Sequence, residues 1–245
     1  MKKTIIVIPA RMDSKRFPGK PLAKINDKSM LMHVCEKAIK SKVGEVVVAC
    51  CDEVIKKELK RNNISFIMTK KNHKSGTDRV HEAYKALSKF KKYDIVINLQ
   101  SDIPDIHPKN IQVLNTIMLN QKSSMATLVT KIDDKKHIHN KNIVKAVLAN
   151  GKNSSFRAIY FSRLPIPMNS KKYYEHIGIY AYTTSILQKF VKLKYSLLES
   201  AENLEQLRAL ENNINIDVGI IKRAPFSIDT PEDLRKFKKN NIENE

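Results

Sequence analysis

Residues 4–22 read TIIVIPARMDSKRFPGKPL, and this stretch decides the fold. Its first seven residues are apolar, rich in β-branched side chains and without alternation, which predicts a strand buried on both faces. The loop that follows turns at Pro18-Gly19 and carries four cations, which are Arg11, Lys15, Arg16 and Lys20. In open parallel sheets ligands bind beyond the carboxyl ends of the strands. A basic loop at this point therefore indicates an anion-binding site, and a plain surface loop of an already basic protein is the alternative interpretation.

In the first half of the chain, apolar runs alternate with amphipathic helical patterns, as in βαβ units. Strands are predicted at 4–10, 45–51, 64–69 and 94–100, and helices at 29–41, 53–62 and 78–90. In the second half, strands are predicted at 124–132, 143–149, 157–163, 176–183 and 214–221, and helices near 184–193, 198–211 and 231–240. We expect an α/β fold with a Rossmann-like, mostly parallel sheet flanked by helices and a smaller β-rich insertion.

The domain organisation follows from what the sequence lacks. It contains no internal repeat and no linker rich in Pro, Gly or Ser. We therefore expect residues 1–245 to form one domain. Within it, residues 1–120 or so make the first part, residues 121–215 make the insertion, and residues 216–245 return to the main sheet.

Composition limits the class of protein. No apolar run approaches the roughly 18 residues of a membrane span. The opening MKK and apolar run imitate a signal peptide, but arginine stands where a small-residue cleavage site belongs. The three cysteines, Cys35, Cys50 and Cys51, show no CxxC spacing, which favours reduced structural thiols. We expect a cytoplasmic protein without membrane insertion.

The formal net charge of +20 raises nucleic acid as a possible partner. Only nine of the 45 basic residues are arginines, and the 36 lysines are scattered through every segment. We interpret the lysines, Lys15 included, as solvated surface. The arginines instead gather in motifs, and their planar guanidinium groups suit phosphates and carboxylates. A basic nucleic-acid-binding protein remains the alternative of a different class, although no RRM, KH or zinc-finger pattern supports it.

Two further loops follow predicted strands. Residues 70–79, KKNHKSGTDR, offer Gly76 for a tight turn or close backbone approach, Thr77 as a helix cap, and Arg79 aimed at the crevice. Residues 100–108, QSDIPDIHP, place Asp102 where a carboxylate can hold Mg²⁺, and a turn aspartate before Pro104 is the structural alternative. Asp229 precedes a helix whose N-terminus is predicted by Thr230 and Pro231. Taken by itself, Asp229 is best interpreted as a capping residue. Neither G-x-G-x-x-G nor a Walker motif is present.

The second half carries polar groups that a core does not need. Arg163 ends the predicted strand at 157–163, while His176 and Tyr180 lie on the strand at 176–183. Glu205 and Gln206 lie beside the leucine stripe of the predicted helix at 198–211. His176 can also be interpreted as a partly buried structural histidine. Glu205 and Gln206 can be interpreted as ordinary helix formers.

Taken in order, the segments IPARMDSKRFPGKPL, HKSGTDR, NLQSDIP, YFSRLPIP, HIGIYAY, LEQLR and IDTPEDL resemble those of the 3-deoxy-manno-octulosonate (Kdo) cytidylyltransferases, the CMP-Kdo synthetases. The resemblance extends from residue 4 to residue 236. It implies a CTP-binding part at 1–120 and a sugar-binding and dimerisation part at 121–215.

The resemblance also implies roles for individual residues. The positions that match nucleotide contacts are Pro9, Ala10, Arg11, Arg16, Lys20, Ser75, Gly76 and Arg79. The positions that match the pocket for the acidic sugar are Gln100, Arg163, His176, Tyr180, Glu205 and Gln206. Asp102 and Asp229 match ligands of a Mg²⁺ cofactor. Arg11, Lys20, Asp102 and Asp229 make the implied catalytic set.

The implied reaction transfers CMP from CTP to the anomeric hydroxyl of Kdo, with release of pyrophosphate, for lipopolysaccharide biosynthesis. The implied partners are CTP and Kdo, with a homodimer and without nucleic acid. Three positions depart from the family pattern: Ser101 replaces a glycine, Ile103 an acidic residue and Met168 a tryptophan. These departures leave 8-amino-Kdo or a sialic-acid-like nonulosonate open as the substrate.

Overall fold

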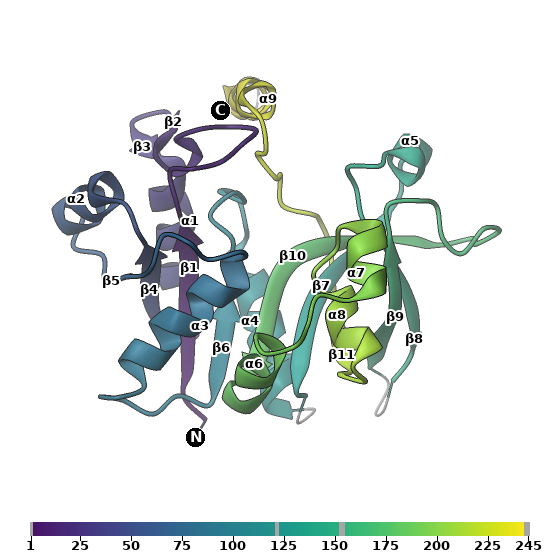
Figure 1. Cartoon of the computed structure of the whole chain (residues 1–245). Helices are drawn as coiled ribbons and strands as arrows, with labels where there is room; N and C mark the ends of the chain where they lie inside the picture. The colour runs from purple at the N-terminus through teal and green to yellow at the C-terminus, as the bar shows by residue number, and fades with distance from the viewer. Residues whose placement is uncertain (1, 121–122, 152–154, 243–245) are drawn as a thin grey trace. The chain divides into compact units, whose positions relative to one another are not determined.

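The computed structural model describes residues 2–120, 123–151 and 155–242, and the chain separates into two compact units (Figure 1). Unit 1 comprises residues 3–112 and the chain from Pro225 onward, and unit 2 comprises residues 113–224. The strand at Ile216–Ile221 pairs within unit 2, and the chain rejoins unit 1 only from Pro225.

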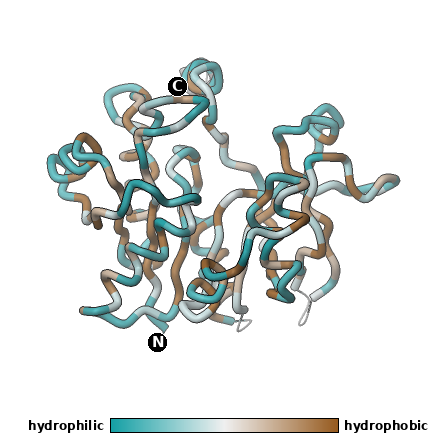
Figure 2. The backbone as a smooth tube through the Cα atoms, viewed as in Figure 1, coloured by the Kyte–Doolittle hydropathy of each residue, from teal (hydrophilic) through white to brown (hydrophobic). Residues whose placement is uncertain are grey.

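The sheet of unit 1 is the predicted parallel one. Its strands are β1 (Thr4–Ala10), β4 (Glu45–Cys50), β5 (Phe66–Met68) and β6 (Ile95–Asn98), in the order β5-β4-β1-β6. All seven residues of β1 are buried, as its lack of alternation predicts. Figure 2 shows hydrophobic residues along this strand. The crossover connections return the chain each time, so the carboxyl ends of β1, β5 and β6 meet at one edge.

Helices flank this sheet. They are α1 (Met30–Lys40), α2 (Glu53–Arg61) and α3 (Gly76–Leu87), and α3 lies in front of β1 in Figure 1. The helix α3 begins two residues earlier than predicted. Its N-cap is Ser75 rather than Thr77, because Ser75 and Asp78 form a reciprocal capping box.

The C-terminal segment packs on the start of the chain within unit 1. Ile228 and Phe237 of the segment ending in α9 (Pro231–Ile242) form a buried cluster with Ile25 and Met30. Ile25 belongs to the small hairpin of β2 (Lys24–Ile25) and β3 (Lys28–Ser29), which follows the 3-10 helix η1 (Lys20–Leu22). This packing brings two segments from opposite ends of the sequence to the same place.

Unit 2 is the β-rich part. Its strands are β7 (Met125–Ile132), β8 (Lys145–Asn150), β9 (Phe156–Ser162), β10 (Tyr173–Thr183) and β11 (Ile216–Ile221), in the order β10-β7-β11-β9-β8. Only β7 and β11 are parallel neighbours, whereas the other pairs among these described strands are antiparallel. β8 also pairs with β10 through Lys145 and Glu175, which joins the two ends of this order.

The helices of unit 2 include one clear correction. The predicted helix at 198–211 is two short helices, α7 (Leu197–Glu202) and α8 (Leu207–Glu211). Asn203 ends α7 with φ +54°, a left-handed conformation that asparagine tolerates better than most residues. The break places Glu205 and Gln206 in the connecting turn instead of on a helix. The other short helices are α5 (Lys135–His139) and α6 (Thr184–Phe190).

The helix α4 (Pro108–Asn120) is absent from the predictions, although its buried Ile111, Leu114 and Met118 follow a helical period. The predicted α/β fold, with a mostly parallel sheet, flanking helices and a smaller β-rich part, is confirmed. Among the described residues, no helix combines the length and apolar character needed to cross a membrane.

Candidate active site

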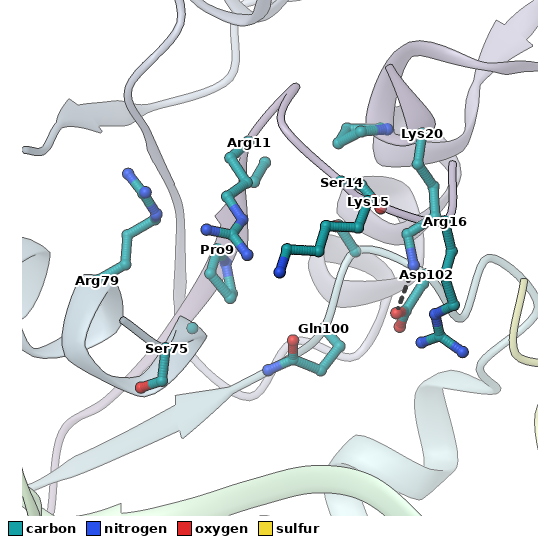
Figure 3. Close-up of a pocket in the computed structure, with 14 residues that line it drawn as sticks. Pro9, Arg11, Ser14, Lys15, Arg16, Lys20, Ser75, Arg79, Gln100 and Asp102 are labelled. Carbon is teal, nitrogen blue, oxygen red and sulfur yellow. Dashed lines mark hydrogen bonds and ion pairs between the residues drawn. The ribbon is translucent and has the colours of Figure 1, made fainter. Parts of the chain in front are cut away.

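A cavity of about 380 Å³ opens at the carboxyl edge of the unit 1 sheet (Figure 3). Three loops line it: the one after β1, the one entering α3 and the one after β6. Every residue that matches a nucleotide contact lines this cavity. The full lining is Pro9, Ala10, Arg11, Ser14, Lys15, Arg16, Lys20, Pro21, Ser75, Gly76, Arg79, Gln100, Ser101 and Asp102.

The loop after β1 is held in shape by its backbone. The carbonyl of Met12 accepts hydrogen bonds from the amides of Ser14 and Gly19, at 3.1 and 2.9 Å. The Met12 amide in turn donates to the carboxylate of Asp52 at 3.0 Å. Gly19 has φ +75°, where a side chain would strain the backbone. The loop therefore has a fixed closed form that presents its cations to the cavity.

The N-terminus of α3 forms the second wall. Ser75 and Gly76 line the cavity, and helix N-termini favour anions because of their free amides and their dipole. Gly76 has no positive φ, so its backbone does not require a glycine; a Cβ there would lie 3.5 Å from Pro9 and Gln100. Its missing side chain therefore leaves room in the cavity.

Arg79 is an interior cation of this wall. Its side chain is buried, and Nη1 donates to the Thr69 hydroxyl at 2.5 Å and to the Lys70 carbonyl at 3.2 Å. Nη2 is buried and has no hydrogen-bond partner within the described part of the chain. A buried donor without a partner is costly, and an anionic or carbonyl group of a ligand would satisfy it.

Gln100 belongs to this cavity as well. Its side-chain amide donates to the Asn98 side chain at 2.7 Å, and Asn98 donates to Thr77 at 3.3 Å. The resemblance grouped Gln100 with the sugar residues, most of which lie in unit 2. The structure places it among the nucleotide-matching residues of unit 1.

Asp102 and Asp229 converge on one ammonium group. Lys20 Nζ lies 2.9 Å from Asp102 Oδ2 and 3.2 Å from Asp229 Oδ1, and Arg16 lies 3.1 Å from the same Asp229 oxygen. The two loops are joined by the Ile228 amide, which donates to the Asp102 carbonyl at 2.9 Å. Two carboxylates from distant segments are thus arranged to share positive charge.

The structure corrects the interpretation of Asp229 as a helix cap. Thr230 and Asp233 satisfy the start of α9, since the Thr230 hydroxyl accepts from the Asp233 amide and Asp233 accepts from the Thr230 amide. The Asp229 side chain is left to Lys20 and Arg16. Its position is therefore set by charge pairing and not by helix capping.

These carboxylates fit a metal that takes part of its coordination from a substrate. Among the described residues, no group of three or more His, Cys, Asp and Glu side chains is placed to hold an ion. Mg²⁺ keeps several waters and commonly takes one or two carboxylates together with phosphate oxygens. Asp102 and Asp229 supply that number of carboxylates.

In unit 2, Arg163 is braced by its neighbours. Its backbone amide donates to the Glu202 carboxylate at 3.1 Å, Nε donates to the Glu202 carbonyl at 3.3 Å, and Nη1 donates to the Lys141 carbonyl at 3.1 Å. The Arg163 carbonyl accepts from the ammonium of Lys145 at 2.6 Å. Sequence reasoning identified Arg163 but missed Glu202 and Lys145, which hold it.

His176 and Tyr180 lie side by side on β10, with ring centroids 5.4 Å apart. Burial lowers the pKa of His176 to about 3, so its imidazole is neutral. The hydroxyl of Tyr180 is buried and has no hydrogen-bond partner within the described residues. Burial, the first cause, together with Tyr182 and Glu205, raises the pKa of Tyr180 well above its usual value.

Gln206 adds a second unpaired polar group to unit 2. It is buried at the N-cap of α8, and its Nε2 has no partner within the described residues. The turn that carries Glu205 and Gln206 is braced by Arg208, which makes a bidentate pair with Glu199 at 2.7 and 2.5 Å. Native structures leave few buried polar groups unpaired, so these atoms mark a place for a polar ligand.

The cavity also holds a lysine that the sequence predictions assigned to the solvated surface. Lys15 lines the cavity, and Figure 3 shows its side chain directed inward beside Arg11, although the lysine excess had explained it as surface. Its place between two predicted arginines was the available signal.

The three positions that depart from the family pattern lie in different surroundings. Ser101 lines the nucleotide-matching cavity, whereas Ile103 is buried. Met168 is 83% exposed and lines a second cavity in unit 2, of about 570 Å³.

Comparison with known proteins agrees with this geometry. A family model described as cytidylyltransferase matches residues 5–216. The 3-deoxy-manno-octulosonate cytidylyltransferases of Paramagnetospirillum magneticum and Rhizobium meliloti are 42% and 41% identical to the chain, over 95% and 97% of it and 95% of each relative. A solved structure of CMP:2-keto-3-deoxy-manno-octonic acid synthetase complexed with CTP is 36% identical, with a TM-score of 0.91 over the full length of both chains.

Proposed function

Because this chain belongs to the cytidylyltransferase family, we propose that it transfers CMP from CTP to the anomeric hydroxyl of Kdo and releases pyrophosphate. The observation that carries the proposal is the unit 1 cavity, where the cationic β1 loop faces the N-terminus of α3 and adjoins the Lys20, Asp102 and Asp229 cluster. The product would activate Kdo for lipopolysaccharide biosynthesis.

The chemistry needs no nucleophile from the protein. The anomeric oxygen of the sugar forms a bond to the α-phosphorus of CTP, and the bond from that phosphorus to the bridging oxygen of pyrophosphate breaks. The hydroxyl proton leaves to solvent or to a pyrophosphate oxygen. Charge therefore accumulates on the departing pyrophosphate, and cations placed beforehand around it lower the barrier.

The residues of unit 1 divide this work. Arg11, Arg16 and Lys20 bind the triphosphate, with Lys15 as an additional cation of the same loop. Arg79 and the free amides at Gly76 hold the nucleotide. Asp102 and Asp229 would hold Mg²⁺, which when bound neutralises phosphate charge and orients the phosphate oxygens.

We assign the sugar to residues of unit 2. A guanidinium suits the carboxylate of an acidic sugar, and Arg163 is the braced arginine of this unit. The unpaired Tyr180 hydroxyl and Gln206 amide offer hydrogen bonds to sugar hydroxyls. Gln100, which the resemblance also matches to the sugar, lines the unit 1 cavity. We further propose a cytoplasmic homodimer that does not bind nucleic acid.

The test is a pyrophosphate-release assay with CTP, Mg²⁺ and a panel of Kdo, 8-amino-Kdo and a sialic acid. We expect turnover with Kdo and its loss when EDTA removes the metal. Turnover of 8-amino-Kdo alone would assign the enzyme to that sugar, and turnover of the sialic acid alone would refute the Kdo assignment. No turnover with any sugar, together with salt-dependent binding of nucleic acid, would favour the alternative class.

A further inference from the structure

Thr127 is a buried residue of β7 whose hydroxyl contacts two backbone carbonyls and one imidazole nitrogen of β10. Its Oγ1 lies 2.8 Å from the carbonyl of Ile179, 3.1 Å from the carbonyl of Ile177 and 3.1 Å from Nε2 of His176. The register between β7 and β10 shifts between Ile177 and Tyr180, so the side chain of Thr127 fills a gap in the ladder. Thr127 is fully buried, so water does not take over these contacts.

A threonine hydroxyl has one hydrogen to donate and lone pairs to accept with. The two carbonyls can only accept, and the shorter contact goes to Ile179. If Thr127 gave its hydrogen to His176, both carbonyl oxygens would face its lone pairs at about hydrogen-bond distance, which is repulsive. The hydroxyl therefore donates to the backbone and accepts from His176.

This direction fixes the tautomer of His176. Nε2 must carry the hydrogen, and Nδ1 is left with a lone pair. Nδ1 makes no hydrogen bond within the described part of the chain. The ring lies between Phe161 and Tyr180, with centroids at 5.0 and 5.4 Å. Burial lowers the pKa of His176 to about 3, so the lone pair persists at neutral pH.

We propose that Thr127 is a positioning residue that holds His176 in its Nε2–H tautomer, so that Nδ1 accepts a hydrogen bond from a hydroxyl of the sugar. The inference rests on the proposed function only for the identity of the ligand. It assigns complementary roles on β10: His176 is an acceptor for the sugar, and the unpaired Tyr180 hydroxyl can donate. A substrate group at His176 must then carry a hydrogen.

The experiment combines NMR and kinetics on the full chain. ¹⁵N-histidine spectra of the wild type should show His176 with hydrogen on Nε2. Thr127→Val keeps the volume and removes the hydroxyl, so we expect the Nδ1–H tautomer to gain population. The KM for the sugar should rise about tenfold, which is the worth of one hydrogen bond, while the KM for CTP stays unchanged. Thr127→Ser should restore both signals.

A wild-type His176 with hydrogen on Nδ1 would overturn the inference, as would a Thr127→Val protein that keeps both its tautomer and its sugar KM. If Thr127→Val does not fold, the wild-type spectrum still decides the tautomer, and Thr127→Ala, which also lacks the hydroxyl, gives the tautomer and KM readouts in its place. The two proposals fail separately, because the tautomer is read without substrate. An Nε2–H tautomer in a protein that does not use Kdo would overturn the proposed function and leave the positioning of His176 intact.

Discussion

Replacing Asp102 by asparagine tests the proposed catalytic role of this carboxylate apart from its structural one. The amide oxygen of the Asp102→Asn side chain can still accept from Lys20 Nζ, which lies 2.9 Å from Asp102 Oδ2, and the ammonium keeps Asp229 at 3.2 Å. The Ile228 amide still finds the backbone carbonyl of residue 102. The substitution removes one negative charge and leaves the hydrogen bonds of the loop in place.

The expected loss of stability is small. The side chains of Lys20 and Asp102 are 13% and 24% exposed, so solvent screens the pair in part. Such pairs contribute about 1 kcal/mol or less to the free energy of unfolding. Activity should fall much further, since a metal ligand acts on the charge of the transition state. Losing one such stabilising group typically lowers kcat about 10²- to 10³-fold, or roughly 3–4 kcal/mol.

The assay pairs pyrophosphate release with urea unfolding of the same preparation. Asp133→Asn is the matched control, because Asp133 is 78% exposed and pairs only with Lys131, at 2.6 Å, among the described residues; it should change neither quantity. Asp102→Asn with nearly wild-type turnover would refute the assignment of Asp102 as a metal ligand. A loss of several kcal/mol in stability would show that the activity falls for structural reasons.

Two further predictions concern unit 2. Below pH 6.5 His176 is protonated in the unfolded chain, but it stays neutral in the folded chain, where its pKa is lowered to about 3. The free energy of unfolding should therefore decrease from pH 6.5 towards pH 3, by at most about 1.4 kcal/mol per pH unit. Urea unfolding at pH 7, 6 and 5 should show a shallower decrease for His176→Gln, and parallel curves would contradict the neutral histidine. Lys145→Met should cost roughly 3 kcal/mol in unfolding free energy, because it removes three hydrogen bonds and takes the ammonium donor from the part-buried Ile143 and Arg163 carbonyls, while the Asn140 carbonyl keeps the Ile143 amide. Lys131→Met, on an exposed pair, should cost less than about 0.5 kcal/mol, and equal costs would show that burial of Lys145 is unimportant.

Local patterns explain which parts of the fold the sequence could predict. The strand β1 and the helix α1 have patterns that depend only on neighbouring residues, and both were predicted to within a residue. The break between α7 and α8 was not predicted, because the leucine stripe continues across it. A single left-handed residue, Asn203, interrupts the helix, and one residue of weak helix propensity does not by itself predict a break.

Long-range partners explain what was missed at the site. Asp102 and Asp229 were singled out separately, but only the packing of α9 on the start of the chain shows that one ammonium joins them. Arg163 and Glu202 are 39 residues apart, and neither segment carries a sequence pattern that predicts their contact. The sequence thus indicated which residue types could act, while their mutual arrangement required the fold.

The lysines show why charge alone is a poor guide in this chain. Lys20 bridges two carboxylates, Lys145 is fully buried and donates to three backbone carbonyls, and Lys131 makes one exposed pair. All three contribute equally to the formal net charge of +20. Burial reduces solvent screening and makes an unpaired partner costly, so substitutions at Lys20 and Lys145 should matter more than substitution at Lys131. The role of each cation follows from its partners, and the excess of lysine is not by itself evidence for a nucleic-acid partner.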